Sequence, residues 1–399
     1  MSAALDTTLE LVAGGVAYTG WETIEIERGI DACASHFTVT CPERFLGNGL
    51  PVPLAPFTPV QLRLKGQIIL TGYVFAYDAQ FAPGQRRASI SGRSLTAQLV
   101  DCSPDIPAGQ YQGYSLAAIA NSLCQLFGLK AKIQTNLANA ALADATLERA
   151  ETAFRFIDRL ATICGVLAFD DESGALVLAN AGASRASGTL TEGGNIVSAR
   201  LQNDCAERYS TYIVKGQSGI CAAAGASGFP SGAGEAGAAD DASPSLVTPP
   251  TGAVQTQQRA VANDPGVPLY RPKIIIAEGQ LDQAQLQLRA NWQRAYAYGK
   301  SLAATFTVPG WTQPDTSFWR INEMATANSP TLGIDEDLLI LKTAFRYSGR
   351  DGYLTEITIG PVEGAIPSPS LLRHRRRKRG RHARGKGGFD FSALGVAKA

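Results

Sequence analysis

One short segment combines the residue types of a nucleophilic site. In SISGRSLTAQLVDCS, residues 89–103, the Ser94 hydroxyl and the Cys102 thiol lie close in sequence to the charged side chains of Arg93 and Asp101. A serine or cysteine nucleophile needs a neighbouring base, most often a histidine, to accept its proton. The segment is therefore either part of a catalytic site or a structural corner.

The histidines argue against catalysis. His36 is the only one outside the basic C-terminal segment, and it begins HFTVTC, in which Phe37, Val39 and Cys41 alternate with polar residues. This period of two predicts a strand with one buried face, and His36 is out of phase with the buried residues. We therefore expect His36 to face solvent, and the sequence predicts no catalytic residues.

Metal and cofactor sites are not predicted either. Cys33, His36 and Cys41 could supply three metal ligands, but no fourth ligand follows at a suitable spacing. The seven cysteines include no CxxC pair, so we expect reduced, mostly buried thiols. GAGEAG, residues 232–237, fits GxGxxG but lacks the preceding strand and the following helix of a phosphate-binding loop.

Two acidic pairs could form carboxylate sites. Asp170–Asp171 and Asp335–Asp337 fall at predicted turns, where solvated side chains are the usual arrangement. Neighbours in sequence do not by themselves make a catalytic pair, so we expect these carboxylates to be exposed to solvent.

Charge is strongly segregated along the chain. The net charge is +1, but residues 1–372 carry 26 basic and 34 acidic side chains, a net charge of −8. The compensating cations are clustered in a C-terminal tail, residues 373–386. A tail this basic is either solvated and disordered, or it binds phosphates or an acidic protein surface in a salt-dependent way. No aromatic residue is interleaved with its cations, so base stacking is not expected. The tail, RHRRRKRGRHARGK, holds nine cations and no acid: Arg373, Arg375, Arg376, Arg377, Lys378, Arg379, Arg381, Arg384 and Lys386.

The length and composition suit a globular protein of two to four domains. The chain has 399 residues, of which 45% are hydrophobic and 18% charged. No apolar run approaches the roughly 18 residues that cross a bilayer. The N-terminal segment also lacks the features of a secretory signal. We therefore expect synthesis and assembly in a cytoplasm, without stable membrane insertion.

The first hundred residues read as β structure. TIEIERG alternates apolar and acidic residues, and residues 60–81 suggest two strands around Gly66, with a bulge or a close backbone approach at Gly72. Many short strands separated by glycine and proline favour an antiparallel barrel or sandwich. We assign residues 1–101 to a first β-barrel-like domain.

Residues 102–182 form a small α/β module in this interpretation. One predicted helix follows the N-cap Ser115 and ends near Gly128. A second spans about 153–164, with Thr152 as its cap and Gly165 at its end. A β-hairpin then turns at residues 172–174.

Residues 183–362 resume the β pattern as a second barrel-like domain. In residues 216–268, 32 of the 53 residues are Gly, Ala, Ser or Pro, so we predict a flexible loop there. A helix is expected over 283–298, with Asp282 and Gln285 as a capping box. Its predicted apolar stripe is Leu288, Trp292 and Ala295, and Gly299 is expected to end it. A hairpin turning at residues 348–352 and a disordered basic tail, residues 363–399, complete the chain.

Read in order, these segments resemble the baseplate hub proteins of Mu-like contractile phage tails, within the T-even-type central hub superfamily. The match runs over residues 9–365, through segments such as TGWETIEIERGIDACASHFTVT, SISGRSLTAQLVDCS, TAFRFIDRLATICGVLAFDDESGALVLANA and GRDGYLTEITIGPVEG. Neither the 216–268 loop nor the basic tail belongs to a shared motif. Within this resemblance SISGRSLTAQLVDCS is a structural corner: Gly92 permits a turn, Leu95 and Leu99 pack inward, and Arg93 and Asp101 are surface or inter-subunit groups.

The resemblance implies a β-rich α+β fold, with two antiparallel barrel-like tube domains and the α/β module between them. It implies a homotrimeric, non-enzymatic ring in the virion baseplate that adapts a six-fold tail tube to a three-fold central spike. The implied partners are the tail tube protein, the central spike protein, and other baseplate and tape-measure proteins. DNA would pass through the lumen without specific recognition. Two alternatives stay open: a peptidoglycan-binding or cell-wall-active tail protein, and a nucleic-acid-binding protein that acts through its basic tail.

Overall fold

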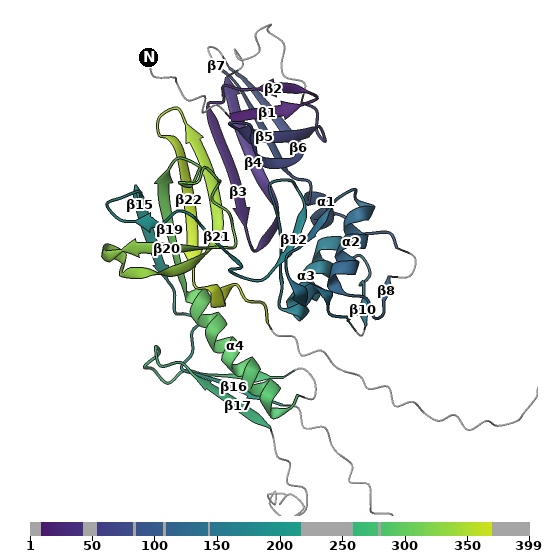
Figure 1. The fold of residues 1–399 in the computed structure, drawn as a ribbon, viewed down its shortest axis with the longest axis vertical. Coiled ribbons are helices and arrows are strands. Elements are labelled where there is room, and N and C mark those ends of the chain that lie inside the picture. Colours follow the sequence, from purple (N-terminus) through teal and green to yellow (C-terminus); the bar gives the residue numbers. More distant parts are fainter. Residues whose placement is uncertain are drawn as a thin grey trace, which may run out of the picture.

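The computed structural model shows a β-rich protein in which strands greatly outnumber helices, so the predicted fold class is confirmed (Figure 1). Among the described residues, no helix is both long and apolar enough to cross a membrane. The structure describes residues 9–42, 54–82, 85–106, 109–142, 144–216, 258–277 and 281–368.

Seven strands form the first tube-like domain. They pair antiparallel in the order β3–β4–β7–β6–β5–β1–β2. The alternation seen in the sequence places Ile24, Ile26, Phe37 and Val39 in the core, as expected, because successive side chains of a strand point to opposite faces. The strands are β1 (Leu9–Ala13), β2 (Val16–Tyr18), β3 (Thr23–Gly29), β4 (Ala32–Pro42), β5 (Pro59–Leu64), β6 (Gln67–Ala82) and β7 (Gln85–Ser94).

Seven more strands build the second tube-like domain, and they continue the same sheet. β15, β19, β22 and β21 pair in that order, β20 pairs with β21, and β13 and β14 pair with β20. β21 also pairs antiparallel with β3, where Phe345 lies opposite Ile26, so one apolar core runs behind both domains. The strands are β13 (Ser184–Arg185), β14 (Leu190–Thr191), β15 (Ser198–Asn203), β19 (Leu302–Pro309), β20 (Glu323–Ser329), β21 (Ile334–Ser348) and β22 (Gly352–Gly360).

Two glycines allow the backbones of β6 and β7 to approach closely. A Cβ atom on Gly72 would lie 2.0 Å from the Arg93 carbonyl oxygen, which confirms the predicted close approach. On Gly92 it would lie 2.2 Å from the Tyr73 carbonyl oxygen and 2.5 Å from the Phe37 ring. The prediction that Gly92 permits a turn is wrong, because Gly92 lies within β7 and is required there by packing.

The α/β module lies beside the ends of β3 and β4 (Figure 1). Its helix caps are as predicted: Ser115 and Thr152 accept hydrogen bonds from backbone N–H groups in the first turns of α2 and α3, and Gly165 ends α3 with left-handed φ. The elements are α1 (Ala97–Asp101), β8 (Gln110–Tyr111), α2 (Leu116–Leu126), β9 (Ala131–Ile133), η2 (Asn136–Asn139), β10 (Ala145–Thr146), α3 (Ala153–Cys164), β11 (Leu167–Asp170) and β12 (Leu176–Ala179).

A separate small cluster interrupts the second tube-like domain. Strands β16 (Thr211–Lys215), β17 (Arg259–Asn263) and β18 (Pro272–Ile276) form a three-stranded sheet with its own apolar core against α4 (Gln283–Ser301). The predicted loop 216–268 is too long at its C-terminal end, because β17 lies inside that range. The remainder, residues 217–257, lies outside the described residues.

Helix α4 differs from its prediction in two respects, although the Asp282–Gln285 capping box is confirmed. The helix continues past Gly299, where a Cβ atom would lie 2.0 Å from the backbone nitrogen of Gly364. Close packing, not helix termination, explains this glycine. The predicted stripe is also wrong, because Leu288 is exposed and the face that packs on the sheet of β16–β18 carries Leu286 and Ala290.

The tail was predicted to begin at residue 363, but the chain after β22 still contacts α4 beyond that residue. Residues Val362–Gly364 form the 3-10 helix η4, and the Trp292 indole N–H donates to the Ile366 carbonyl oxygen at 3.1 Å. A further 3-10 turn, η3 (Pro330–Leu332), connects β20 and β21. Residues 369–399, including all nine clustered cations, lie outside the described residues.

Candidate functional site on the sheet face and at the domain joints

Ser94 does not have the surroundings of a nucleophile. Its side chain is fully buried, and its hydroxyl lies 2.7 Å from that of Thr96. His36 pairs with Arg93 across β4 and β7, and its ring lies on the exposed side, 3.5 Å from a Glu27 carboxylate oxygen. Adjacent residues of a strand face opposite sides. Ser94 and His36 are therefore separated by the sheet, and His36 faces solvent as predicted.

The remaining residues of this segment make a structural corner. Arg93 donates to both carboxylate oxygens of Asp101, at 3.0 and 2.8 Å, across the turn that connects β7 to α1. Its guanidinium also lies 5.9 Å from the centre of the Phe75 ring. Leu99 is fully buried in the module core, which confirms its inward packing, and Cys102 is exposed.

The proposed metal ligands do not converge. Cys33 and Cys41 are buried, whereas His36 points to the other side of β4. Burial raises the pKa of the Cys41 thiol and raises that of Cys124 to about 12, so these thiols stay protonated and act as apolar core groups. Among the described residues, no group of three His, Cys, Asp or Glu side chains is arranged to hold a metal ion.

The acidic pairs are structural, and their predicted solvation is wrong in part. Asp170 is buried and accepts two hydrogen bonds from Ser35. Asp335 and Asp337 lie within β21, where Asp337 accepts two hydrogen bonds from Arg185. The GAGEAG segment, residues 232–237, lies outside the described residues.

One face of the large sheet is polar across eight adjacent strands, and we call it the polar strand face. The register connects its residues across β15, β19, β22, β21, β3, β4, β7 and β6 without a change of side. The polar side chains named below are exposed or half-buried, with Ser and Thr frequent, whereas Ala344 at the centre of the face is buried. The face includes Ser198, Arg200, Gln202, Thr305, Thr307, Glu356, Thr358, Lys342, Arg346, Ser348, Thr23, Glu25, Glu27, His36, Thr38, Thr40, Arg87, Ser89, Ser91, Arg93, Asp78 and Gln80.

Most charges at the centre of the polar strand face are paired with one another. The Lys342 ammonium lies 2.6 Å from Glu27, and Arg346 bridges Glu25 at 3.2 Å and Glu356 at 2.5 Å. Burial alone would raise the pKa of Glu27. The hydrogen bond and charge of Lys342, with smaller effects of His36 and Arg346, bring that pKa below its usual value. The face therefore carries charge without a large excess of either sign.

Alternation in the sequence contained the signal for this face. The residues out of phase with the predicted core positions are its members, and their Ser, Thr and charged side chains are the local signal for a solvated face. The continuity of the face could not be read from the sequence, because it depends on the pairing of β3 with β21, whose residues are more than three hundred positions apart.

A charged joint connects the two tube-like domains to the module. Arg28 of β3 is buried and lies 3.3 Å from Glu172 in the β11–β12 turn, which also accepts from Arg320 at 2.9 Å. Burial would raise the pKa of Glu172, but these two guanidinium groups hold it below its usual value. The arrangement fixes three parts of the chain relative to one another.

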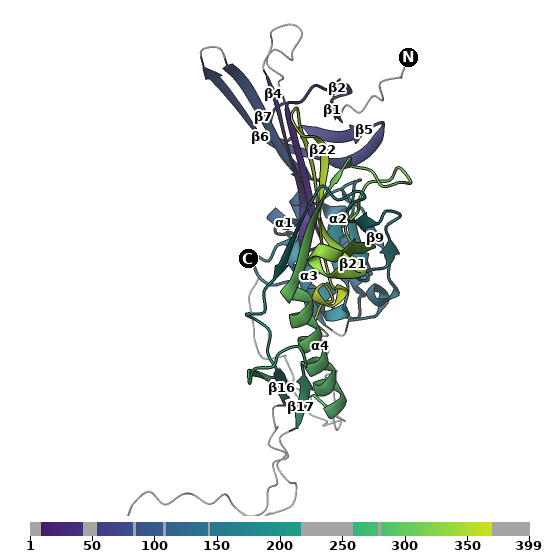
Figure 2. The ribbon, with the colours of Figure 1, turned by 90° about the vertical axis from the view of Figure 1, so that its left-hand side faces the viewer.

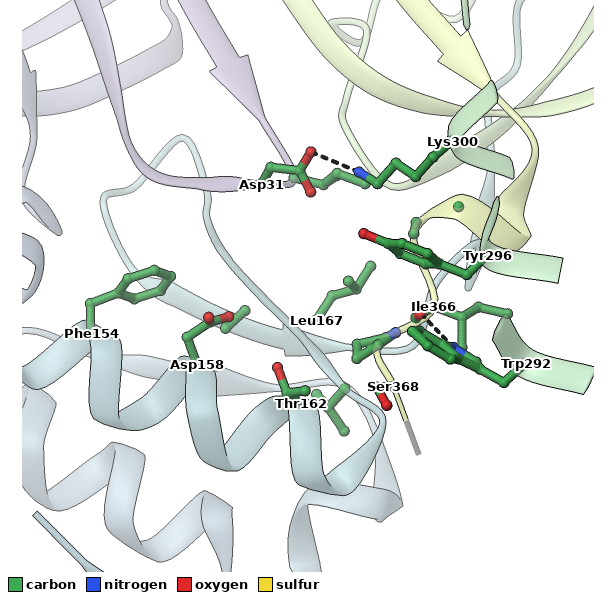
Figure 3. A pocket seen from close by; sticks show the side chains of 16 residues that line it. Asp31, Phe154, Asp158, Thr162, Leu167, Trp292, Tyr296, Lys300, Ile366 and Ser368 are labelled. Atoms are coloured by element: carbon green, nitrogen blue, oxygen red, sulfur yellow. Dashed lines mark hydrogen bonds and ion pairs between the residues drawn. The ribbon is translucent and has the colours of Figure 1, made fainter. Parts of the chain in front are cut away.

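A second joint lies where the module, the β3–β4 turn and α4 meet (Figure 3). It surrounds a cleft of about 380 Å³. Trp292 and Tyr296 stack at 4.8 Å on one side, and the Lys300 ammonium reaches Asp31 at 3.4 Å. Burial, with a smaller effect of Asp31, raises the pKa of Asp158 on the opposite wall. The lining side chains come from the β3–β4 turn, the module, α4 and the segment after η4, so we interpret the cleft as a seam between domains.

Comparison with known families decides the affiliation. Residues 8–94 match the family described as Mu phage baseplate assembly protein GpP-like, N-terminal. Residues 96–180 match baseplate hub protein gp44-like, second domain, and residues 282–368 match Mu phage baseplate assembly protein GpP, fourth domain. The chain belongs to the Mu-like baseplate hub family. The resemblance inferred from the sequence is thereby confirmed.

Individual relatives of this hub family extend the match to nearly the whole chain. Baseplate hub protein gp44 of Escherichia phage Mu is 28% identical over 383 residues, which are 93% of each chain. The prophage MuSo2 43 kDa tail protein from Shewanella oneidensis is 28% identical in sequence. Its crystal structure matches 90% of this chain and 99% of that one with a TM-score of 0.74. A tail protein from Neisseria meningitidis MC58, 22% identical, shares the fold with a TM-score of 0.69 over 91% and 98% of the two chains.

These findings establish the role of the chain as a phage baseplate hub, located in the tail baseplate. The names of these relatives describe structural baseplate and tail proteins. They give no support to the alternative of a peptidoglycan-binding or cell-wall-active protein.

Proposed function

We propose that three copies of this hub protein form a ring whose channel is lined by the polar strand face. The observation that carries this proposal is the continuity of that face across eight strands of one sheet, with a single apolar core on the opposite side. A sheet with one solvated face and one core face suits the wall of a water-filled channel.

The two tube-like domains suggest how the ring would match its neighbours. We assign them to residues 1–101 and 183–362 and the linking module to 102–182, with the small cluster of β16–β18 and α4 as an excursion from the second domain. Two similar strand groups in each of three subunits would present six units to a six-fold tail tube. The same ring would present three equivalent surfaces to a three-fold central spike.

The paired charges of the polar strand face suit the passage of DNA without specific recognition. Arg346 and Lys342 are engaged by carboxylates on neighbouring strands, so they are poorly placed to bind phosphates. The channel wall would then neither hold DNA by a cationic surface nor oppose it by a strong excess of negative charge. We propose this as the physical reason why genome delivery would not stall in the hub.

The partners follow from the position of such a ring. We propose contacts with the tail tube protein, the central spike protein, and other baseplate and tape-measure proteins. The nine cations between Arg373 and Lys386 are proposed to contact an anionic partner surface. No enzymatic step is required, and the buried, histidine-free surroundings of Ser94 support a purely structural role.

Electron microscopy and light scattering of the purified full-length chain test the ring. We expect a trimer, formed alone or on addition of the spike protein, with three-fold projections around a central channel. A chain that stays monomeric with and without the spike, or that forms a closed dimer, would contradict the proposal.

A further inference from the structure

The cleft between the module and α4 is the place where the described chain ends. Helix α3 and the C-terminal end of α4 form its walls, and both views of the fold place them next to the lower end of the large sheet (Figures 1 and 2). The Trp292 indole N–H donates to the Ile366 carbonyl oxygen at 3.1 Å, and Pro367 and Ser368 line the cleft. In Figure 3, Ser368 lies between the side chains of α3 and those of α4. The chain therefore leaves the described body from inside this cleft.

The lining of the cleft is rich in aromatic side chains. Phe154 of α3 faces it from one wall, and Trp292 and Tyr296 of α4, which stack with ring centres 4.8 Å apart, face it from the other. All three rings are partly exposed. Such rings favour contact with apolar side chains, because the contact removes apolar surface from water.

The same cleft contains a carboxylate without a cation. Lys300 is the only cation among the lining residues, and it reaches Asp31 at 3.4 Å. No other cation of the lining is left to pair with Asp158 of α3. Burial and the nearby charge of Asp31 both raise the pKa of Asp158, so a second cation close to these two carboxylates would be stabilising.

The sequence that follows Ser368 carries the matching side chains. It reads PSLLR, residues 369–373, in which an apolar pair directly precedes the first of the nine clustered cations. Ser368 and Asp158 line one cleft of about 380 Å³. Five residues span up to about 18 Å, so Arg373 can reach Asp158 while the two leucines lie near the aromatic rings. This segment is also tethered at the cleft, which gives it a higher effective concentration there than a separate partner would have.

We infer that Leu371, Leu372 and Arg373 dock in this cleft of their own chain. The leucines pack on the aromatic rings of the two walls, and the Arg373 guanidinium pairs with the Asp158 carboxylate. The other eight clustered cations stay available for the anionic partner contact proposed above. Ordering the segment costs conformational entropy that offsets most of these contacts. Docking is therefore reversible, and the melting temperature of the body hardly depends on it.

Acrylamide quenching of tryptophan fluorescence in the full-length chain tests the docking. The other three tryptophans are buried, so this neutral quencher reports mainly on Trp292. For the double variant Leu371→Ser, Leu372→Ser, we expect the quenching constant to rise by at least half, because Trp292 becomes more accessible. Leu394→Ser is the control, since it makes the same kind of change later in the tail and should leave quenching unchanged. All three positions follow the described core, so neither variant removes a core contact.

Charge reversal tests the ion pair separately. Arg373→Glu should raise the quenching constant, whereas Arg384→Glu makes the same change of charge further along the tail and should not. Asp158→Lys combined with Arg373→Glu should restore the wild-type value, because the pair is then formed with its charges exchanged. Circular dichroism verifies that the variants at Asp158 are folded.

Three results would overturn the inference. The first is equal quenching of the wild type and of the leucine double variant. The second is an equal effect of Arg373→Glu and Arg384→Glu, which would mean that the tail is attracted by overall charge and not by this cleft. The third is a loss of Trp292 protection on dilution, which would mean that the tail of another copy occupies the cleft.

Discussion

Ser35 and Asp170 bind each other across the joint between the first tube-like domain and the module. The Ser35 backbone N–H and hydroxyl donate to the two carboxylate oxygens of Asp170, each at 2.9 Å, and both residues are buried. The contact ties β4 to β11, so the module is held to the sheet by a pair of hydrogen bonds that water cannot replace.

Replacing Asp170 by alanine should therefore destabilise the protein strongly. Two buried donors of Ser35 would lose their acceptor, which costs about 3 kcal/mol in the free energy of unfolding. Urea denaturation measures the change. Asp101→Asn is the control, because the Arg93–Asp101 pair is largely exposed and should contribute less than about 1 kcal/mol. If both variants lost similar amounts of unfolding free energy, the buried Ser35–Asp170 hydrogen bonds would contribute no more to stability than the Arg93–Asp101 pair.

Gly92→Ala should distort the pairing of β6 with β7. The new methyl carbon would lie 2.2 Å from the Tyr73 carbonyl oxygen and 2.5 Å from the Phe37 ring, well inside van der Waals contact. We therefore expect the free energy of unfolding to fall by about 3 kcal/mol, or the variant not to fold. Gly349→Ala provides the comparison, since no atom lies within 4 Å of its added Cβ and its φ is not left-handed. Thermal unfolding of the two variants measures the difference, and equal melting temperatures would contradict the close-approach interpretation.

The module should lose stability in acid through Glu151. Its carboxylate accepts from Arg159 at 3.0 and 2.8 Å and from the Glu148 backbone N–H at 2.9 Å. Burial alone would raise the pKa of Glu151, but these partners lower it below its usual value near 4.5. A carboxyl group whose pKa is lower in the folded state stabilises above its unfolded pKa, and this stabilisation is lost as pH falls through the folded pKa.

Unfolding free energies measured from neutral pH downwards check this expectation. Stability should begin to fall near pH 4.5, and Glu151→Gln should make the curve flatter in that range. Glu207→Gln, at an exposed position, should leave the curve unchanged. A Glu151→Gln curve parallel to that of the wild type would show that this carboxylate does not govern the acid response.

Ending the chain after Ser368 should leave the melting temperature nearly unchanged and weaken polyanion binding. The described core ends at Ser368, whereas the nine cations follow it. Binding to heparin should weaken, and its dependence on salt should become less steep, because fewer counterions are released. A full-length variant with all nine cations replaced by glutamine separates charge from length. A large drop in melting temperature on truncation would mean that the tail packs on the body.

Local signals in the sequence determined much of the secondary structure. The caps at Ser115 and Thr152 and the Asp282–Gln285 capping box depend on hydrogen bonds between residues three positions apart, so short segments specify them. Alternation likewise assigned the core sides of β3 and β4, because side-chain direction in a strand has a period of two. The absence of a base near Ser94 was also readable, since histidine is so rare in this chain.

Only the tertiary structure decided what depends on residues far apart in sequence. Helix α4 continues through Gly299 because Gly364 packs against it, and its buried face is set by the sheet of β16–β18. The pairing of β3 with β21 joins the two tube-like domains into one polar strand face. None of these outcomes leaves a local pattern, because each is determined by the free energy of contacts that form only when distant segments meet.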